Sequence, residues 1–221
     1  MKTNTGKNLL LNLIDDLPEI YQPIYKHEEL PLNVSRQCID RWPKILDIYR
    51  LANRHFKRPL RILDLGCAQG FFSLKLASIG ATVFGIDYND KNIALCQYLA
   101  SLNPSHKVQF ELNDIQTIVS ILKPDQFDIV LGLSVFHHLV HEQGLFQIQQ
   151  LIETISVNIP MGIYELALRE EPLYWAESLP EDPLDLISSY KNIMELSKVG
   201  THLSSVNRPL IAATSYLRFD D

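Results

Sequence analysis

Cysteine is scarce in this chain, and its basic residues form no cluster. The 221 residues include only three cysteines, Cys38, Cys67 and Cys96. Three is too few, and an odd number, for a disulfide framework, so we expect a reducing compartment. The formal net charge is -6, and no block of lysine and arginine interrupts the sequence. Both features argue against nucleic acid as a partner, because binding to a phosphate backbone requires a positively charged patch.

Long apolar runs are also lacking. No stretch of the sequence approaches the roughly 20 apolar residues that span a bilayer. The polar segment Met1–Asn8 has no signal-peptide cleavage site. We therefore expect a cytoplasmic protein without direct membrane insertion. Any recruitment to the inner face of a membrane would depend on partners.

Ligands for a structural or catalytic metal are too few in this sequence. His137, His138 and His141 lie close together and could be read as half of a zinc site. Zinc usually requires three or four ligands, and neither a cysteine spacing nor an H-E-x-x-H motif completes the set. We expect no bound metal.

A glycine turn with a carboxylate just before it is the most informative feature that is present. Residues 61–65 are a mostly apolar strand, and the turn that follows contains Gly66, Ala68 and Gly70, with Asp64 two positions before Gly66. Such a turn at the start of a helix usually offers N–H groups and the positive end of the helix dipole to a phosphate. A fixed negative charge would repel that ligand, so the turn favours a cationic cofactor.

A second carboxylate, Asp87, ends the next apolar run about 20 residues further on. An acid at that place can accept hydrogen bonds from both hydroxyls of a ribose. The fingerprint for a dinucleotide such as NAD would need glycine or alanine where Phe71 stands. The alternative is that Asp64 and Asp87 are ordinary turn residues between core strands.

The spacing D-x-G-x-A-x-G resembles the first motif of the class I S-adenosylmethionine-dependent methyltransferases. Ala68 stands where that family has a third glycine, and we expect it at negative φ, where one methyl group still allows close backbone approach. The resemblance implies S-adenosylmethionine as cofactor. Cys67, within the turn, is expected to be a small buried residue beside the cofactor rather than a nucleophile.

The remaining sequence alternates strands and helices. We expect strands at 108–112, 127–133 and 161–167, a helix from about 142 to 157, a helix at 184–190, and closing strands at 192–199 and 209–216. This pattern is typical of the Rossmann-like class I methyltransferase fold, an α/β fold whose mostly parallel seven-stranded sheet has helices on both faces and a C-terminal antiparallel hairpin. We divide the single domain into a helical lid segment, residues 1–58, and a methyltransferase core, residues 59–221.

Residues that follow strand ends are the further site candidates, because ligands of an open parallel sheet bind at its carboxyl edge. Asp114 is placed to accept a hydrogen bond from the adenine amino group, and Ile115 is placed to cover the adenine ring. An equal alternative for Asp114 is that it caps the next helix. Tyr88 and Leu133 complete the expected cofactor contacts. His137 and His138 follow the fourth strand and could take a proton or, if charged, hold an anion; packing is their alternative role.

Several segments extend the resemblance beyond the fold, and they are distributed over most of the chain: residues 17–22, 59–60, 63–74, 132–138, 165–167 and 170–175. They are similar to the methyltransferase domain of the WbdD-like O-antigen chain terminators, which are bifunctional kinases and methyltransferases. In that family the methyltransferase caps a terminal sugar phosphate and so stops growth of the O-antigen of lipopolysaccharide. No kinase glycine-rich loop, H-R-D loop or D-F-G motif occurs in this sequence.

The resemblance implies roles for individual residues. Tyr21 and Gln22 would lie over the cofactor, and Arg41 would hold its methionine carboxylate. The expected acceptor residues are His137, His138, Glu165 and Arg169, with Arg208 and Tyr174 as further candidates. The acceptor would be a saccharide or glycan phosphate, and a kinase domain or kinase partner and a glycosyltransferase would act with this chain.

Two other functions stay open. One is methyl transfer to a different small acceptor, such as a sugar hydroxyl or a carboxylate. The other is a cofactor-binding regulatory module without turnover.

Overall fold

The computed structural model describes residues 2–30 and 32–215, and these residues contain one mixed sheet of seven strands. The order of the strands across the sheet is β3-β2-β1-β4-β5-β7-β6. Neighbours from β3 to β5 are parallel, whereas β7 is antiparallel to both β5 and β6. The strands are β1 (Arg61–Leu65), β2 (Thr82–Asp87), β3 (Lys107–Leu112), β4 (Ile129–Leu133), β5 (Met161–Glu165), β6 (Asn192–Val199) and β7 (Arg208–Thr214). The predicted Rossmann-like methyltransferase architecture is confirmed.

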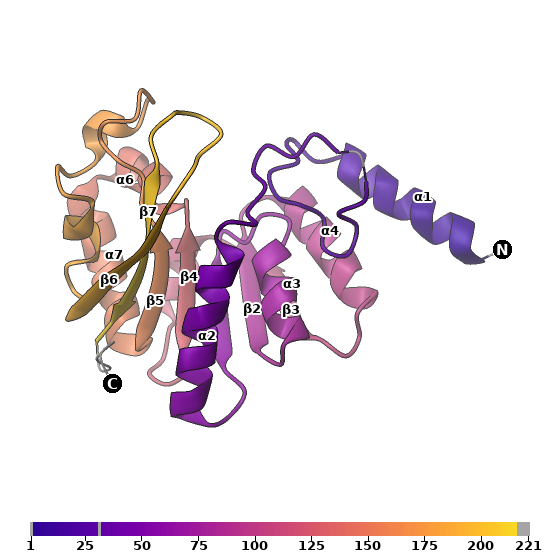
Figure 1. Cartoon of the computed structure of the whole chain (residues 1–221), viewed down its shortest axis with the longest axis horizontal. Helices are drawn as coiled ribbons and strands as arrows, with labels where there is room; N and C mark the ends of the chain where they lie inside the picture. The colour runs from indigo at the N-terminus through magenta and orange to yellow at the C-terminus, as the bar shows by residue number, and fades with distance from the viewer. Residues whose placement is uncertain (1, 31, 216–221) are drawn as a thin grey trace.

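Helices cover both faces of this sheet (Figure 1). Buried side chains of α2 and α3 pack on one face, and those of α5, α6 and α7 pack on the other. The helices are α1 (Lys2–Asp15), α2 (Trp42–Phe56), α3 (Phe71–Ser78), α4 (Asp90–Ser101), α5 (Ile115–Ser120), α6 (Phe136–Gln143) and α7 (Leu145–Asn158), with two short 3-10 helices, η1 (Ala176–Ser178) and η2 (Pro183–Ile187). No helix in the described part of the chain is both long and apolar enough to cross a membrane.

Some element boundaries differ from the sequence-based prediction. The helix expected from about 142 to 157 is present as α7 but begins at Leu145, because Gly144 separates it from α6. The φ of Gly144, 92°, lies where L residues are rarely found, which breaks the helix there. The helix expected at 184–190 is a short 3-10 helix in which Pro183 takes the first position. Residue 216, the expected end of the last strand, lies outside the described residues.

The segment between α1 and α2 passes over the carboxyl edge of the sheet and carries the residues expected to cover a cofactor (Figure 1). Gln22 fixes it to the glycine turn: its N–H donates to Gln69 Oε1 (2.8 Å), and its Oε1 accepts from the N–H of Phe71 (3.1 Å). The helix α2, by contrast, packs on the sheet itself. The division at residue 58 stays a prediction.

Candidate active site

A cavity of about 890 Å³ lies at the carboxyl edge of the sheet. This edge includes the point between β1 and β4 where the strand order reverses, which is where open α/β sheets bind ligands. The volume is in the range of ordinary small-molecule sites. The predicted residues that line it are Tyr21, Gly66, Asp87, Tyr88, Asp114, Ile115, Leu133, His137 and His138.

The glycine turn forms one wall of the cavity. Gly66 and Gly70 have positive φ, 68° and 73°. A side chain at Gly70 would meet Cys96 Sγ at 2.9 Å, so glycine is also needed there for space. Ala68 has a φ of 48°, so the expectation of a negative φ is wrong. Its N–H donates to Asp87 Oδ2 (2.9 Å), and this bond holds alanine in a conformation that usually favours glycine.

Asp87 is held at the end of β2 with its carboxylate at the cavity. Besides the bond from Ala68, its Oδ1 accepts from the N–H of Asn89 (2.9 Å) and from Asn92 Nδ2 (3.2 Å). These three bonds orient the carboxylate and leave about one of its four acceptor sites for a further donor. The arrangement fits a hydrogen bond from a ribose hydroxyl.

Asp64 lies beneath the turn and is not among the residues that line the cavity. Its side chain is 3% exposed and accepts a hydrogen bond from Ser73 Oγ (2.5 Å). Burial raises the pKa of Asp64 to about 6, although the bond from Ser73 opposes the shift. The carboxyl group is therefore mostly ionised at neutral pH, and its charge acts on the turn from below. Nearby Cys67 is also buried, and burial raises its pKa well above the usual range, which keeps it a thiol.

The residues expected at the adenine lie near the cavity mouth. Asp114 lines the cavity and also caps α5, accepting from the N–H (2.7 Å) and Oγ1 (2.8 Å) of Thr117. The capping role is therefore present, and contact with adenine stays a prediction. Ile115 is buried, whereas Tyr88 is 82% exposed.

Aromatic side chains from α6 and from the segment after β5 form a second wall of the cavity. His137 lies 4.1 Å from His138 and 4.5 Å from Trp175, measured between ring centroids. His138 Nδ1 is 2.9 Å from the hydroxyl of Tyr174, which is 64% exposed. Burial lowers the pKa of His137 to about 2, with His138 and Arg208 adding to the effect. Burial and Arg208 also lower the pKa of His138, so both rings are neutral at pH 7.

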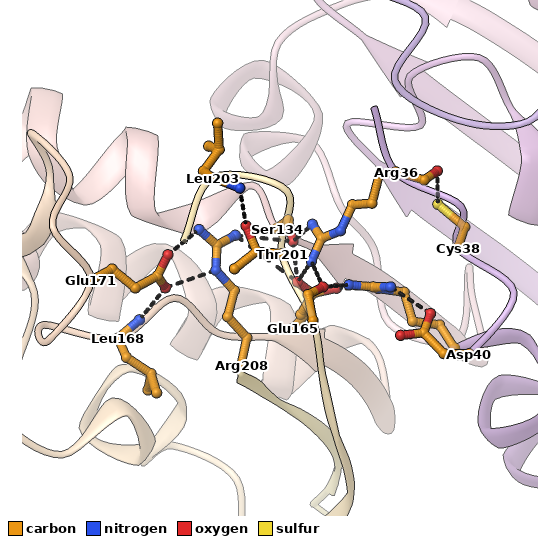
Figure 2. A network of polar contacts seen from close by, with 12 residues as sticks. Arg36, Cys38, Asp40, Ser134, Glu165, Leu168, Glu171, Thr201, Leu203 and Arg208 are labelled. Atoms are coloured by element: carbon orange, nitrogen blue, oxygen red, sulfur yellow. Dashed lines mark hydrogen bonds and ion pairs between the residues drawn. The ribbon is translucent and has the colours of Figure 1, made fainter. Parts of the chain in front are cut away.

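A buried network of charges lies behind this wall (Figure 2). Glu165, at the end of β5, accepts from Arg36, from Arg41 Nε (2.6 Å) and from Ser134 Oγ (2.5 Å). Burial alone would raise the pKa of Glu165, but Arg36 and Arg41 outweigh it and hold the pKa below its usual value. Arg36 also donates to the hydroxyl of Tyr21 (2.7 Å), so the network fixes the segment over the cavity.

The network places Arg41 away from its expected ligand. Arg41 is 2% exposed and does not line the cavity. Besides Glu165, it donates to the carbonyl oxygen of Gly200 (2.7 Å) and to Asp40 Oδ1 (2.5 Å). With these partners already in place, the structure does not favour the expected pairing of Arg41 with a methionine carboxylate.

Three further site candidates also lie off the cavity. Glu165 faces the arginines, and Gln22 serves to join the overlying segment to the turn. The third, Arg169, is half-exposed, donates to the carbonyl oxygen of Leu179 (3.2 Å) and pairs with Glu181 (3.3 Å). In this structure the side chains of these three residues contact other parts of the protein and do not line the cavity.

Sequence reasoning missed Ser134, Arg36 and Glu171. Ser134 lines the cavity and directly follows β4, so the strand-end rule could have found it. Arg36 and Glu171 lie in loops, and no spacing in the sequence distinguishes them from surface charges. Within the described residues, no group of three or more His, Cys, Asp or Glu side chains is placed to hold a metal ion.

Comparisons with known proteins agree with this geometry. A family model described as "Methyltransferase domain" matches residues 56–172. The O-antigen chain terminator bifunctional methyltransferase/kinase WbdD of Escherichia coli is 42% identical over 207 residues, which cover 94% of this chain and 29% of that protein. This chain thus spans less than a third of that relative.

Solved structures match as well. A crystal structure of WbdD superposes with a TM-score of 0.91 at 42% identity, covering 93% of this chain and 47% of that one. The N-terminal domain of EvdMO1, crystallised with SAH and D-fucose, gives a TM-score of 0.61 at 16% identity and covers 94% and 96% of the two chains. At that identity the second match shows a shared fold only.

Proposed function

Because the chain belongs to the methyltransferase domain family, we propose that it is an S-adenosylmethionine-dependent O-methyltransferase whose acceptor is a terminal sugar phosphate. One observation carries the proposal. A single cavity joins the Gly66 and Asp87 wall, suited to a nucleoside, to a wall that contains His138, Tyr174 and Arg208. A methyl donor and an acceptor can therefore meet in one enclosed space.

The first wall suits S-adenosylmethionine better than a dinucleotide. Asp87 is oriented for the ribose, and the buried charge of Asp64 favours a cationic group at the turn. The segment that carries Tyr21 lies over this end and limits access of water. With such a cofactor, the protein contributes to catalysis mainly by excluding water and by aligning the two reactants.

Three ionisable side chains at or behind the acceptor wall are poor general bases. Methyl transfer from the sulfonium of bound S-adenosylmethionine leaves a thioether and adds the methyl group to the acceptor oxygen. A hydroxyl would have to lose its proton, but the low pKa of His137, about 2, makes it a poor proton acceptor. The buried carboxylates Glu165 and Glu171 are both engaged by arginines. A phosphate monoester, with a second pKa near 6, has an oxygen that is already ionised.

The partners follow from the likeness to WbdD, which is described as a bifunctional methyltransferase and kinase. We infer that a kinase domain or kinase partner supplies the phosphorylated glycan, and that a glycosyltransferase makes the chain whose growth the methyl group ends. The reaction would take place in the cytoplasm, with partners bringing this chain to the inner face of the membrane.

The proposed acceptor can be tested directly. We would incubate the protein with radiolabelled S-adenosylmethionine and a 3-phosphorylated mannose oligosaccharide, its unphosphorylated parent or other hydroxyl acceptors. The phosphorylated glycan is expected to be methylated at least tenfold faster than the parent. Equal rates would reject the phosphate acceptor and favour a hydroxyl acceptor. Cofactor binding without any turnover would favour a regulatory module.

Asp87→Ala is expected to weaken the binding of S-adenosylmethionine at least tenfold. Hydrogen bonds to a charged group contribute about 1.5 to 3 kcal/mol each, and about 1.4 kcal/mol corresponds to one decade in affinity. Titration calorimetry gives the dissociation constants, with NAD as a ligand that should bind more weakly than S-adenosylmethionine. The matched control is Asp90→Ala, an exposed carboxylate three residues away that does not line the cavity. An unchanged constant in folded Asp87→Ala protein would limit Asp87 to a structural role.

A further inference from the structure

One guanidinium reaches the cavity. Arg208, the first residue of β7, is 2% exposed and lines the cavity. Among the described residues that form the lining, no other is an arginine or a lysine. Its neighbour Arg36 is turned toward Glu165, on the other side of the network (Figure 2). Arg41 also donates to Glu165.

Glu171 holds Arg208 by one edge, whereas the other edge makes only longer contacts, among them an ion pair of Nη1 with Glu165 Oε1 (4.0 Å). Arg208 Nε donates to Glu171 Oε1 (2.8 Å), and Nη2 donates to Oε2 (2.7 Å). The N–H of Leu168 donates to Glu171 Oε1 (2.9 Å), which fixes the carboxylate. The remaining nitrogen, Nη1, donates over a long 3.3 Å to Ser134 Oγ, which also lines the cavity. These three contacts leave two of the five N–H donors of the guanidinium for a ligand.

The buried charges of the network do not cancel. Three buried guanidiniums, Arg36, Arg41 and Arg208, share the two buried carboxylates Glu165 and Glu171. A third carboxylate, Asp40, is half-exposed and pairs with Arg41 on the side away from Arg208 (Figure 2). A buried charge is costly unless it is paired. Arg208 is already paired with Glu171, so an anionic group in the cavity would bind through the N–H donors that Arg208 has left.

The histidines of the same wall do not supply this positive charge. Their lowered pKa values keep His137 and His138 neutral at pH 7, and burial also lowers the pKa of His202. The carboxylates that line the cavity are Glu19, Asp87, Asp114 and Glu142, and Glu142 lies on α6 with the two histidines. The expectation that charged histidines hold an anion is thus not supported, and Arg208 takes that place.

We propose that Arg208 binds the anionic group of the acceptor and that Glu171 is its positioning residue. This inference rests on the proposed function and names the residue that recognises the phosphate. The choice of the acceptor over the cofactor follows from position. Arg208 lies 5.8 Å from the ring centroid of Trp175, which in turn contacts His137 and His138, the side chains expected at the acceptor.

The test uses a double variant that removes the buried ion pair of Arg208 and Glu171 as a whole. Arg208→Gln with Glu171→Gln removes one charge of each sign, so the net charge of the protein is unchanged. The KM for the 3-phosphorylated mannose oligosaccharide is expected to rise at least tenfold, while kcat stays within threefold and the dissociation constant of S-adenosylmethionine within twofold. Glu171→Gln alone keeps the cation and should raise this KM by less than threefold. The control is Arg50→Gln, an exposed residue of α2.

Other outcomes of these measurements would overturn the inference. A tenfold weaker binding of S-adenosylmethionine with an unchanged KM would assign Arg208 to the cofactor carboxylate and overturn the inference. A folded double variant with no change in either constant would make the pair structural only. Arg208→Lys serves if the double variant does not fold: it keeps the charge but loses the bidentate geometry, and an unchanged KM in it would likewise overturn the inference.

Failure of the proposed function is measured separately. Calorimetric titration of the wild-type protein with mannose 3-phosphate requires no turnover. If mannose 3-phosphate binds in a way that depends on Arg208 but no methyl group is transferred, the inference of an anion site stands and the proposed reaction is rejected. Absence of binding to the wild-type protein would reject the anion site.

Discussion

Replacing Glu165 by alanine is expected to lower the free energy of unfolding by about 3 to 5 kcal/mol, the usual cost of removing one partner from a buried ion pair. Glu165 is 2% exposed and accepts from both Arg36 and Arg41, which are themselves buried. Without it, two guanidiniums would be left in the protein interior with incomplete pairing. Urea denaturation followed by circular dichroism measures the change.

Glu195→Ala is the control for this prediction, because Glu195 is an exposed carboxylate on the edge strand β6. It should change the free energy of unfolding by less than about 0.5 kcal/mol, as is usual for surface substitutions. A similar small effect at Glu165 would mean that the arginines find other partners or water, and that the network does not hold the overlying segment in place.

Asp64→Asn is expected to stabilise the protein at pH 7.5 by up to about 3 kcal/mol and to have little effect at pH 4. Burial raises the pKa of Asp64 from 3.8 to about 6. A raised pKa means that the folded state holds its proton more tightly than the unfolded state does. This contribution to stability is complete below pH 3.8 and is lost as the pH rises through 6. About two pKa units at 1.36 kcal/mol each give the stated figure.

The amide of asparagine keeps the shape of aspartic acid but has no charge to bury. Denaturation curves of wild type and variant at pH 4, 6 and 7.5 measure the difference, with the exposed Asp125→Asn as control. The same variant should bind S-adenosylmethionine more weakly, since the negative charge beneath the turn is lost. If Asp64→Asn is no more stable than wild type at pH 7.5, the carboxyl group is less desolvated than its burial indicates.

The sequence predicted the fold well because its strands are local features. Apolar runs ending at Leu65, Asp87 and Leu133 mark buried parallel strands, and all three appear as such. The glycine turn and Asp87 belong to one βαβ unit, so their spacing along the chain determines their spacing in the molecule. The break at Gly144 was missed because the apolar positions on both sides of it are compatible with one continuous helix.

The charge network could not be read from the sequence. Arg36 and Glu165 are 129 residues apart, and no local pattern shows which of many loop charges become buried partners. The family resemblance placed Arg41 at the cofactor, whereas the structure pairs it with Glu165. The sequence offered Arg208 only as one of several candidate cations for the acceptor. Its burial, which the sequence does not show, separates it from the half-exposed Arg169.

The bonds of Arg36 have a consequence for synthesis on the ribosome. Arg36 ties the segment that carries Tyr21 to Glu165 and to the carbonyl oxygen of Gly200, which is 164 residues further along the chain. At translation rates of 5 to 20 residues per second, roughly 10 to 30 seconds separate the emergence of the two ends. Once Asp87 has been made, Gln22 can already join this segment to the glycine turn. The bonds of Arg36 to Glu165 and Gly200 have to wait for the last strands, so until then fewer contacts hold the cover over a bound cofactor.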